Sequence, residues 1–409
     1  MPKISTRAEK MPASPIRKLV PLAEDAQKRG NHVYFLNIGQ PDIPTPPEYY
    51  QAIRTADLKV LAYSHSAGNE SLRAKIAAYY TRLDLPITTN EVLVTTGASE
   101  ALLFIFMACL NPGDEIIVPQ PFYANYNSFA LTAGVKVVPI TTHIENDFDL
   151  PEIETFEALI TPKTKAILIC NPGNPTGILY SQKSLEKLRD IVIKHDLYLI
   201  ADEVYREFVY DGHKHHSIFS LSGLGEKAIV VDSISKRFSA CGARIGCVVT
   251  HNQEVMGAIL KYAQARLSPP TMGQIGAEAV YDLPQSFYDK IISEYSERRT
   301  FLIGELKKME GVLCPEVNGA FYAMVKLPVD DSEKFCRWML ESFSYKGATV
   351  MMAPANGFYA DPSLGTDQVR IAYVLNKTAL ASAMECLAEG LKAYPGRTVE
   401  AKTEKSVTA

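Results

Sequence analysis

The chain has 409 residues, of which 47% are hydrophobic and 22% are charged, and its formal net charge is -4. That length allows two or three domains around a large core. The small negative charge offers no electrostatic footprint for nucleic acid or for an anionic membrane surface. The longest apolar run, residues 101–110, is too short to span a bilayer, so we predict a buried helix there.

The N-terminal residues 1–18 are basic but lack the apolar centre of a secretion signal. The seven cysteines are scattered and never spaced Cys-x-x-Cys. This pattern disfavours a disulfide framework or a zinc site, and we expect a cytoplasmic protein. His213, His215 and His216 lie close together, but no fourth ligand is evident, and their polar surroundings favour a surface loop over a metal site.

Short β-type runs alternate with helical patterns over the first two thirds of the chain. Ser181 is a plausible helix N-cap, and the apolar residues that follow it recur on one helical face. Continuous apolar strands separated by helices predict a mostly parallel sheet that is covered on both faces. The predicted strands are residues 91–96, 115–118, 135–138, 165–170, 197–201 and 228–231.

The regular alternation of strands and helices ends near residue 286, where a smaller α+β domain is predicted. Its expected elements are a helix at 287–308, a strand at 320–325, a helix at 331–343 and a strand at 368–373. We expect the large domain at 46–285, the small domain at 286–395, an N-terminal segment at 1–45 that joins the small domain or bridges the two, and a disordered polar tail at 396–409.

Lys236 is the most informative residue of the chain. It follows the apolar run 228–231, stands beside Ser233 and Ser235, and precedes a Gly-x-Arg-x-Gly that contains Arg244. A lysine can form a Schiff base with an aldehyde, and hydroxyls with an arginine can hold a phosphate. The combination suits pyridoxal phosphate (PLP). The alternative is a strand-to-loop junction with a solvated lysine and a surface arginine.

Two further motifs follow predicted strands, whose carboxyl ends meet at one edge of a parallel sheet. Residues 95–99 read Thr-Thr-Gly-Ala-Ser, and their backbone N–H groups make a phosphate seat at a helix N-terminus, although many such turns look alike. Residues 171–177 read Asn-Pro-Gly-Asn-Pro-Thr-Gly. This is either an ornate loop or a rigid support from which Asn174 donates to a phenolate oxygen.

Asp202 and Arg370 are charges at the end of, or within, apolar runs. A buried Asp202 needs a cationic or hydrogen-bonding partner, which a protonated pyridine nitrogen would supply; the alternative is a helix N-cap. Arg370 must meet an anion or point to solvent. It is either a bidentate clamp on a substrate carboxylate or a surface arginine on an edge strand.

In chain order, these motifs resemble the class I and II aminotransferases of PLP fold type I, and in particular the aspartate and aromatic aminotransferase group. The resemblance extends from Gly39 to Arg370. It implies an α/β fold, with a mostly parallel seven-stranded sheet sandwiched by helices in the large domain and a smaller α+β domain.

The resemblance also implies a role for each residue. Lys236 would hold the cofactor as a Schiff base, Asp202 would pair with the pyridine nitrogen, and Tyr205 and Asn174 would bind the ring hydroxyl oxygen. The implied cofactor-binding residues are Lys236, Ala98, Ser99, Tyr123, Asn174, Asp202, Tyr205, Ser233, Ser235, Arg244 and, from the neighbouring subunit of a homodimer, Tyr63. The implied substrate-binding residues are Gly39, Asn174 and Arg370.

The implied activity is amino-group transfer by ping-pong kinetics, from aspartate or a broader set that includes aromatic amino acids, to a 2-oxo acid such as 2-oxoglutarate or to prephenate. A PLP-dependent lyase, such as a carbon–sulfur lyase, is an alternative on the same fold. A non-catalytic sensor module would need an N-terminal DNA-binding domain, and we consider the stretch before Gly39 too short for one.

Substrate choice is poorly encoded in the sequence. A dicarboxylic preference needs a second cation near the substrate side chain, and the sequence singles out none of the candidates. Residues 354–357 read Pro-Ala-Asn-Gly where many relatives have Pro-Gly. This departure lies near the expected substrate pocket and puts the transfer of specificity from those relatives in doubt. The candidate cations are Arg17, Lys18, Lys261 and Arg266.

Overall fold

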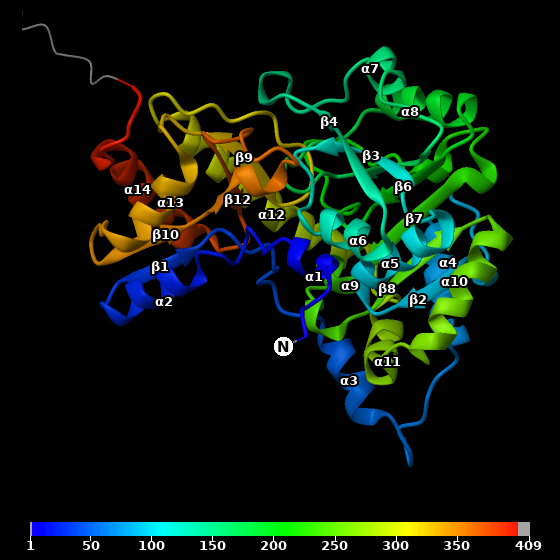
Figure 1. Ribbon diagram of the computed structural model, residues 1–409. Helices are drawn as coiled ribbons and strands as arrows, with labels where there is room; N and C mark the ends of the chain where they lie inside the picture. The colour runs from blue at the N-terminus through cyan, green and yellow to red at the C-terminus, as the bar shows by residue number, and fades with distance from the viewer. Residues whose placement is uncertain (1, 400–409) are drawn as a thin grey trace, which may run out of the picture.

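The computed structural model describes residues 2–399. Within them, the larger part of the molecule is built on a seven-stranded sheet (Figure 1). Its strands are β2 (Val92–Thr95), β3 (Glu115–Gln120), β4 (Lys136–Thr141), β5 (Thr164–Cys170), β6 (Tyr198–Asp202), β7 (Ala228–Ser233) and β8 (Gly246–Thr250). Their order is β2-β8-β7-β6-β5-β3-β4. Neighbours are parallel except that β8 is antiparallel to both β2 and β7. The expected fold class is confirmed.

Alternate residues of the central strands enter two different cores. In β7, Ile229 and Val231 pack into one core, whereas Ala228 and Val230 pack into the other. Successive side chains of a strand point to opposite faces, so a strand covered on both sides must be apolar throughout. One core includes α5 (Gly97–Cys109), α6 (Asn125–Ala133) and α10 (Gln253–Arg266); the other includes α4 (Glu70–Thr81), α7 (Ile153–Glu157), α8 (Gln182–Lys194) and α11 (Thr271–Val280).

Several local predictions are confirmed in this part. The apolar run at 101–110 lies almost wholly in the buried helix α5. Ser181 caps α8, because its Oγ accepts a hydrogen bond from the Ser184 N–H at 3.0 Å. The pattern did not predict β8. That strand starts inside the glycine-containing motif after Lys236, and glycine is a weak strand former.

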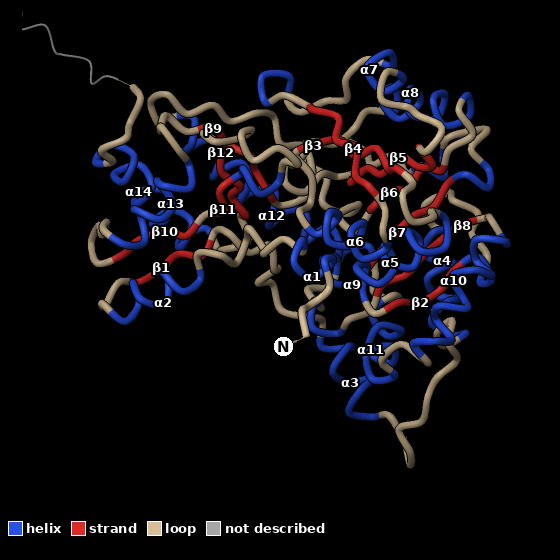
Figure 2. Tube along the Cα trace, viewed as in Figure 1, coloured by secondary structure: helices blue, strands red, loops and turns tan. Residues whose placement is uncertain are grey.

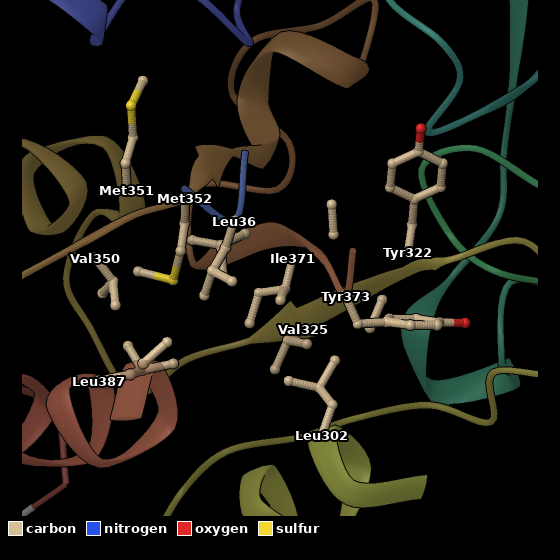
Figure 3. Close-up of a cluster of buried hydrophobic side chains, with 14 of the residues drawn as sticks. Leu36, Leu302, Tyr322, Val325, Val350, Met351, Met352, Ile371, Tyr373 and Leu387 are labelled. Atoms are coloured by element: carbon tan, nitrogen blue, oxygen red, sulfur yellow. The ribbon is translucent and has the colours of Figure 1, made fainter. Parts of the chain in front are cut away.

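The smaller part has its own core, shown in Figure 3, where Leu302, Val325 and Ile371 approach one another. A three-stranded antiparallel sheet runs in the order β11-β12-β9, so β12 is its middle strand. The four elements predicted here all form, with bounds shifted by up to two residues. The predicted elements are α12 (Gln285–Lys307), β9 (Tyr322–Lys326), α13 (Ser332–Glu341) and β12 (Gln368–Ala372). The smaller part also contains β10 (Ala348–Met351), β11 (Ala353–Pro354) and α14 (Lys377–Ala393).

The N-terminal segment lies beside this smaller part, with its blue strand against the orange one in Figure 1. β1 (His32–Phe35) pairs in parallel with β10, and α2 (Val20–Lys28) contacts α13. Ala23 and Ala26 of α2 enter the same core. These contacts support the proposed domain division, whose exact boundaries stay a prediction. The chain also forms α1 (Thr6–Lys10) and α3 (Pro47–Thr55).

The prediction that the disordered tail starts at residue 396 is wrong. The Gly396 carbonyl accepts from the Asp330 N–H at 2.9 Å, and the Thr398 N–H donates to the Pro328 carbonyl at 3.0 Å. Backbone pairing with the small domain therefore holds this stretch in spite of its polar composition. The rest of the predicted tail, residues 400–409, lies outside the described residues. Among residues 2–399, no helix is long and apolar enough to cross a membrane.

Candidate functional site

A cleft of about 560 Å³ is lined by residues from the N-terminal segment, the seven-stranded sheet and the smaller part. All of the predicted site residues line it except Tyr63, which is 78% exposed and lies on the segment between α3 and α4. Asp202 ends β6 and Ser233 ends β7, so adjacent parallel strands deliver their polar residues to one edge. The lining residues that were predicted are Gly39, Ala98, Ser99, Tyr123, Asn174, Asp202, Tyr205, Ser233, Ser235, Lys236, Arg244 and Arg370.

Lys236 lies on the one-turn helix α9 (Ile234–Arg237) directly after β7. Its Nζ donates to the Gly39 carbonyl at 3.0 Å and lies 3.9 Å from the Cys241 Sγ. The next side chain, Arg237, is anchored in the core, where its Nη2 donates to both carboxylate oxygens of Asp232 at 2.9 and 3.1 Å. This buried anchor holds the turn that carries Lys236, while the amine itself has only neutral partners among the described residues.

Asp202 is a buried carboxylate with no cationic partner within residues 2–399. Its Oδ2 accepts from the Tyr126 hydroxyl at 2.9 Å, and its Oδ1 is 3.5 Å from the Val204 N–H. Burial raises the pKa of Asp202 to about 6, because loss of water disfavours the charged form. The chain after Asp202 forms turns rather than a helix, which removes the N-cap alternative. We did not predict Tyr126, which looks like a core aromatic of α6 and is signalled only by its closeness to Tyr123.

Hydroxyls, an arginine and a helix N-terminus gather at another corner of the cleft. The Ser233 Oγ donates to the Ile245 carbonyl and lies 2.8 Å from the Ser235 Oγ. The Arg244 guanidinium donates to the Cys241 and Thr96 carbonyls at 3.1 and 3.3 Å. A Cβ on Gly97, whose φ is +74°, would meet Arg244 Nη2 at 2.3 Å, so only glycine permits this approach to the start of α5. The donors suit a phosphate.

Arg370 is 1% exposed and lies on β12, the middle strand of its sheet. This placement rules out the surface-arginine alternative. Its Nη1 donates to the Asn174 Oδ1 at 2.9 Å, and its Nη2 donates to the Asn37 carbonyl. The guanidinium carbon lies 4.5 Å from the centre of the Tyr322 ring and 4.9 Å from that of Phe358. Burial lowers the pKa of Arg370, because loss of water disfavours the charged form. Its hydrogen-bond partners in the described residues are neutral and carry no compensating negative charge.

A chain of hydroxyls connects Asn174 with Gly39. The Asn174 Nδ2 donates to the Tyr205 hydroxyl at 3.4 Å, and that hydroxyl is 2.9 Å from the Tyr322 hydroxyl. Both Asn-Pro bonds of the 171–177 segment are cis. A Cβ on Gly39 would overlap the Tyr322 hydroxyl. We did not predict Tyr322, because an aromatic residue in an apolar run looks like a core residue.

The structure separates the four candidate cations. Lys18 pairs with Glu333 at 2.6 Å and Arg266 with Glu100 at 2.7 Å, and Lys261 is exposed outside the cleft. Only Arg17 lines the cleft. Asn356 and Gly357 of the Pro-Ala-Asn-Gly segment line a neighbouring pocket instead. Gly357 lies against Pro15 there, in the N-terminal segment that also carries Arg17.

The predicted surface position of the three histidines is wrong for His215, whose side chain is 11% exposed. Its Nε2 lies 3.1 Å from the Asn171 carbonyl and 3.9 Å from the buried Glu203. Burial and the nearby Arg206 hold its pKa well below the usual range. His215 thus packs beneath the Asn-Pro segment, a role that spacing in the sequence does not reveal. Among the described residues, no group of three or more potential metal ligands is found.

Residues 31–387 match the family model of the class I and II aminotransferases. The aspartate aminotransferase of Thermotoga maritima is 33% identical over 385 residues, which cover 93% of this chain and 97% of that protein. Aromatic-amino-acid aminotransferase 2 of Thermococcus litoralis is 30% identical over 397 residues, covering 95% and 98%. The solved alanine aminotransferase from Pyrococcus furiosus superposes with a TM-score of 0.88 at 31% identity, covering 96% of this chain and all of that one.

The chain belongs to the class I and II aminotransferases. Within that family it is similar to aspartate aminotransferases, and it is an enzyme that moves an amino group between an amino acid and a 2-oxo acid. The resemblance seen in the motifs is confirmed. The relatives are named for aspartate, for aromatic amino acids and for alanine, so the comparisons leave the particular substrate open.

Proposed function

We propose that the cleft binds pyridoxal phosphate and uses it for transamination, with the predicted residues in the roles that the motifs imply. The observation that carries this proposal is that the cleft holds ionisable groups without ion-pair partners among the described residues. Within residues 2–399, the Lys236 amine forms no ion pair with a carboxylate, and the buried Asp202 carboxylate forms none with a cation. Both lie in the same cleft as the donor corner at Arg244.

The donor set fits the cofactor group by group. Arg244, Ser233, Ser235 and the start of α5 suit its phosphate. Asp202 suits its ring nitrogen, because a protonated nitrogen would supply the missing cation. The Asn174 amide and the Tyr205 hydroxyl suit its ring oxygen, and Lys236 suits its aldehyde. The proposed cofactor contacts also include Ala98, Ser99 and Tyr123.

When bound, pyridoxal phosphate supplies an aldehyde that bonds to amines and a ring that accepts electrons from the substrate Cα. The residues of the chain do the rest. Arg370 and Asn174 hold the substrate α-carboxylate, which gives the buried guanidinium the anion it lacks. Lys236 Nζ moves the proton at Cα, first as a base and then as an acid. The Gly39 carbonyl positions that amine for the transfer.

The test is an absorbance titration of the protein reconstituted with pyridoxal phosphate, using aspartate or glutamate and no 2-oxo acid. We expect the band of the aldehyde form to be replaced by that of the amine form, with one equivalent of 2-oxo acid released and no ammonia. Continuous release of ammonia from cystathionine, which has the sulfur leaving group that aspartate and glutamate lack, would instead favour the lyase alternative. A protein that binds no cofactor after reconstitution would overturn the proposal.

We further propose a homodimer in which Tyr63 of one subunit reaches the phosphate bound by the other. The segment between α3 and α4 projects from the body of the chain in Figures 1 and 2. It exposes apolar side chains, with Val60 74%, Leu61 65% and Tyr63 78% accessible. An exposed apolar patch of this kind favours an interface, and a two-fold symmetric contact would bring two such segments together.

Subunit hybrids test this arrangement. A dimer of one Lys236→Ala subunit and one Tyr63→Ala subunit has one site with both defects and one site with none, if Tyr63 acts across the interface. Random mixing should then restore about a quarter of the wild-type activity. If Tyr63 acts within its own subunit, each site carries one defect and mixing restores nothing.

A cytoplasmic location is also proposed. All seven cysteines are free thiols, and Cys247, Cys336 and Cys386 are buried among apolar residues. Reduced thiols suit a compartment that keeps them reduced. Fractionation of the source cells, with the activity followed in each fraction, tests this point; activity confined to an oxidising compartment would contradict it.

A further inference from the structure

The N-terminal segment forms one wall of the cleft, through Ser14, Ile16 and Arg17. This wall is held in place by its own backbone turn. The Arg17 and Lys18 N–H groups both donate to the Ser14 carbonyl, at 3.2 and 3.1 Å, and the Val20 N–H donates to the Arg17 carbonyl at 3.0 Å. Hydrogen bonds therefore hold the backbone that carries Arg17, and the residue itself is exposed.

Asn37 connects this wall to the proposed carboxylate site. Its carbonyl accepts from the Arg370 guanidinium, and its side-chain Nδ2 donates to the Ile16 carbonyl at 2.8 Å. One buried residue thus joins the arginine proposed for the α-carboxylate to the residue that precedes Arg17. Both arginines line the same cleft, and Asn37 hydrogen-bonds to the Arg370 guanidinium and to the backbone beside Arg17.

The charges of the cleft single out Arg17. Its lining contains four cations, Arg17, Lys236, Arg244 and Arg370, and one carboxylate, Asp202. The other three cations donate to oxygens of the site, whereas the Arg17 guanidinium has no hydrogen-bond or ion-pair partner among residues 2–399. The adjacent Lys18 is held by Glu333, which in turn accepts from Asn356 at 3.1 Å.

The surroundings of Arg17 suit the side chain of an acidic substrate. Ile16 and Ile38 line the same cleft and can pack against methylene groups, while Arg17 can pair with an anion. We infer that Arg17 binds the side-chain carboxylate of the substrate, so that the enzyme selects dicarboxylic amino acids and 2-oxo acids. This inference deepens the proposed function and rests on it.

The test compares acidic amino acids with their amides, which have nearly the same shape without the charge. The cofactor-loaded wild type, Arg17→Met, Arg17→Lys and the control Lys18→Met are each mixed with glutamate, glutamine, aspartate or asparagine, and single-turnover kcat/KM is measured from the absorbance change. We expect the wild type to prefer each acid over its amide by about 100-fold or more. Arg17→Met should remove most of that ratio, Arg17→Lys should keep part of it, and Lys18→Met should keep it whole.

The outcomes separate this inference from the proposed function. A wild type that turns over acid and amide equally, or an Arg17→Met protein that keeps the wild-type ratio, would overturn the role of Arg17 and leave transamination intact. Equal losses for acids and amides in Arg17→Met would also overturn it, because they would mark a structural effect. A wild type whose spectrum responds to no amino acid would refute both proposals.

Discussion

Two arginines, each 1% exposed, show how burial alone fails to define a role. Arg237, beneath the cleft, pairs with the buried Asp232. Burial acts to lower its pKa, but Asp232 and its other neighbours outweigh that effect and hold the pKa well above the usual range. Arg370, in the cleft, has only neutral partners, and burial lowers its pKa.

The difference separates a core whose buried charges pair within the chain from a cleft in which, under the proposed function, a ligand supplies the partner. The core ion pair balances its charges within the chain, as does the buried pair of Arg206 with Glu203. In the cleft, Arg370 and Asp202 form no ion pair with any of residues 2–399. Because an unpaired buried charge is costly, such groups persist where a ligand supplies the partner. Changes in the core should therefore act on stability, and changes in the cleft on activity.

Lys236→Ala should have the largest effect, because it removes the amine that we propose moves the proton. We expect turnover to fall by about 10³- to 10⁴-fold, equivalent to about 4 to 5.5 kcal/mol in the barrier. The unfolding free energy of the cofactor-free protein should change little. Steady-state kinetics and denaturant unfolding measure the two, with the exposed Lys261→Ala as control. An active Lys236→Ala protein would contradict the site assignment.

Arg237→Met should lower stability by about 3 to 5 kcal/mol, because it leaves Asp232 charged and unpaired in the core. Denaturant midpoints measure the loss. Adding Asp232→Asn to the same protein should restore part of it, since the double variant no longer buries a lone charge. A double variant that is less stable than Arg237→Met would show that the pair acts through something other than charge balance.

Arg370→Met sharpens the contrast, because this arginine is as buried as Arg237. We expect kcat/KM to fall by about 100- to 1000-fold for every amino-acid substrate, since the α-carboxylate loses its proposed partner. The cofactor-free protein should be as stable as the wild type or more so, because an unpaired buried charge is removed. A loss of stability like that of Arg237→Met would place Arg370 with the structural arginines.

The pH dependence of stability offers the smallest of these effects. Burial raises the folded-state pKa of Asp202 to about 6, above its ordinary value of 3.8. The folded, cofactor-free protein therefore holds this proton more tightly than the unfolded chain does. The contribution of Asp202 to stability is greatest below about pH 4 and is lost as the pH rises through 6, a change of about 3 kcal/mol at most. Unfolding curves at pH 4 to 7 should show this slope in the wild type and a flatter one in Asp202→Asn; identical slopes would contradict it.

Local pattern was enough to predict most of the core strands and the principal site motifs. Apolar runs marked β5, β6 and β7, and the polar residues that follow them marked the cleft. It was not enough for Tyr126 or Tyr322, whose hydroxyls meet Asp202 and Tyr205 only after distant segments pack together. Nor could it place His215, because burial of a polar loop residue depends on what covers it.

The sequence by itself predicted the alternation of strands and helices, because local periodicity encodes it. It predicted the class of protein through the resemblance of its contiguous motifs to a known family, and the same resemblance marked the lysine, aspartate and arginine as candidate site residues. Only the tertiary structure decided which charges are balanced. In the sequence, Arg17, Lys18 and Arg266 are equally plausible cations for the cleft. The carboxylate partner of Lys18 lies 315 residues away along the chain, and that of Arg266 lies 166 residues away. Folding brings a carboxylate to each of these two and leaves Arg17 facing the cleft.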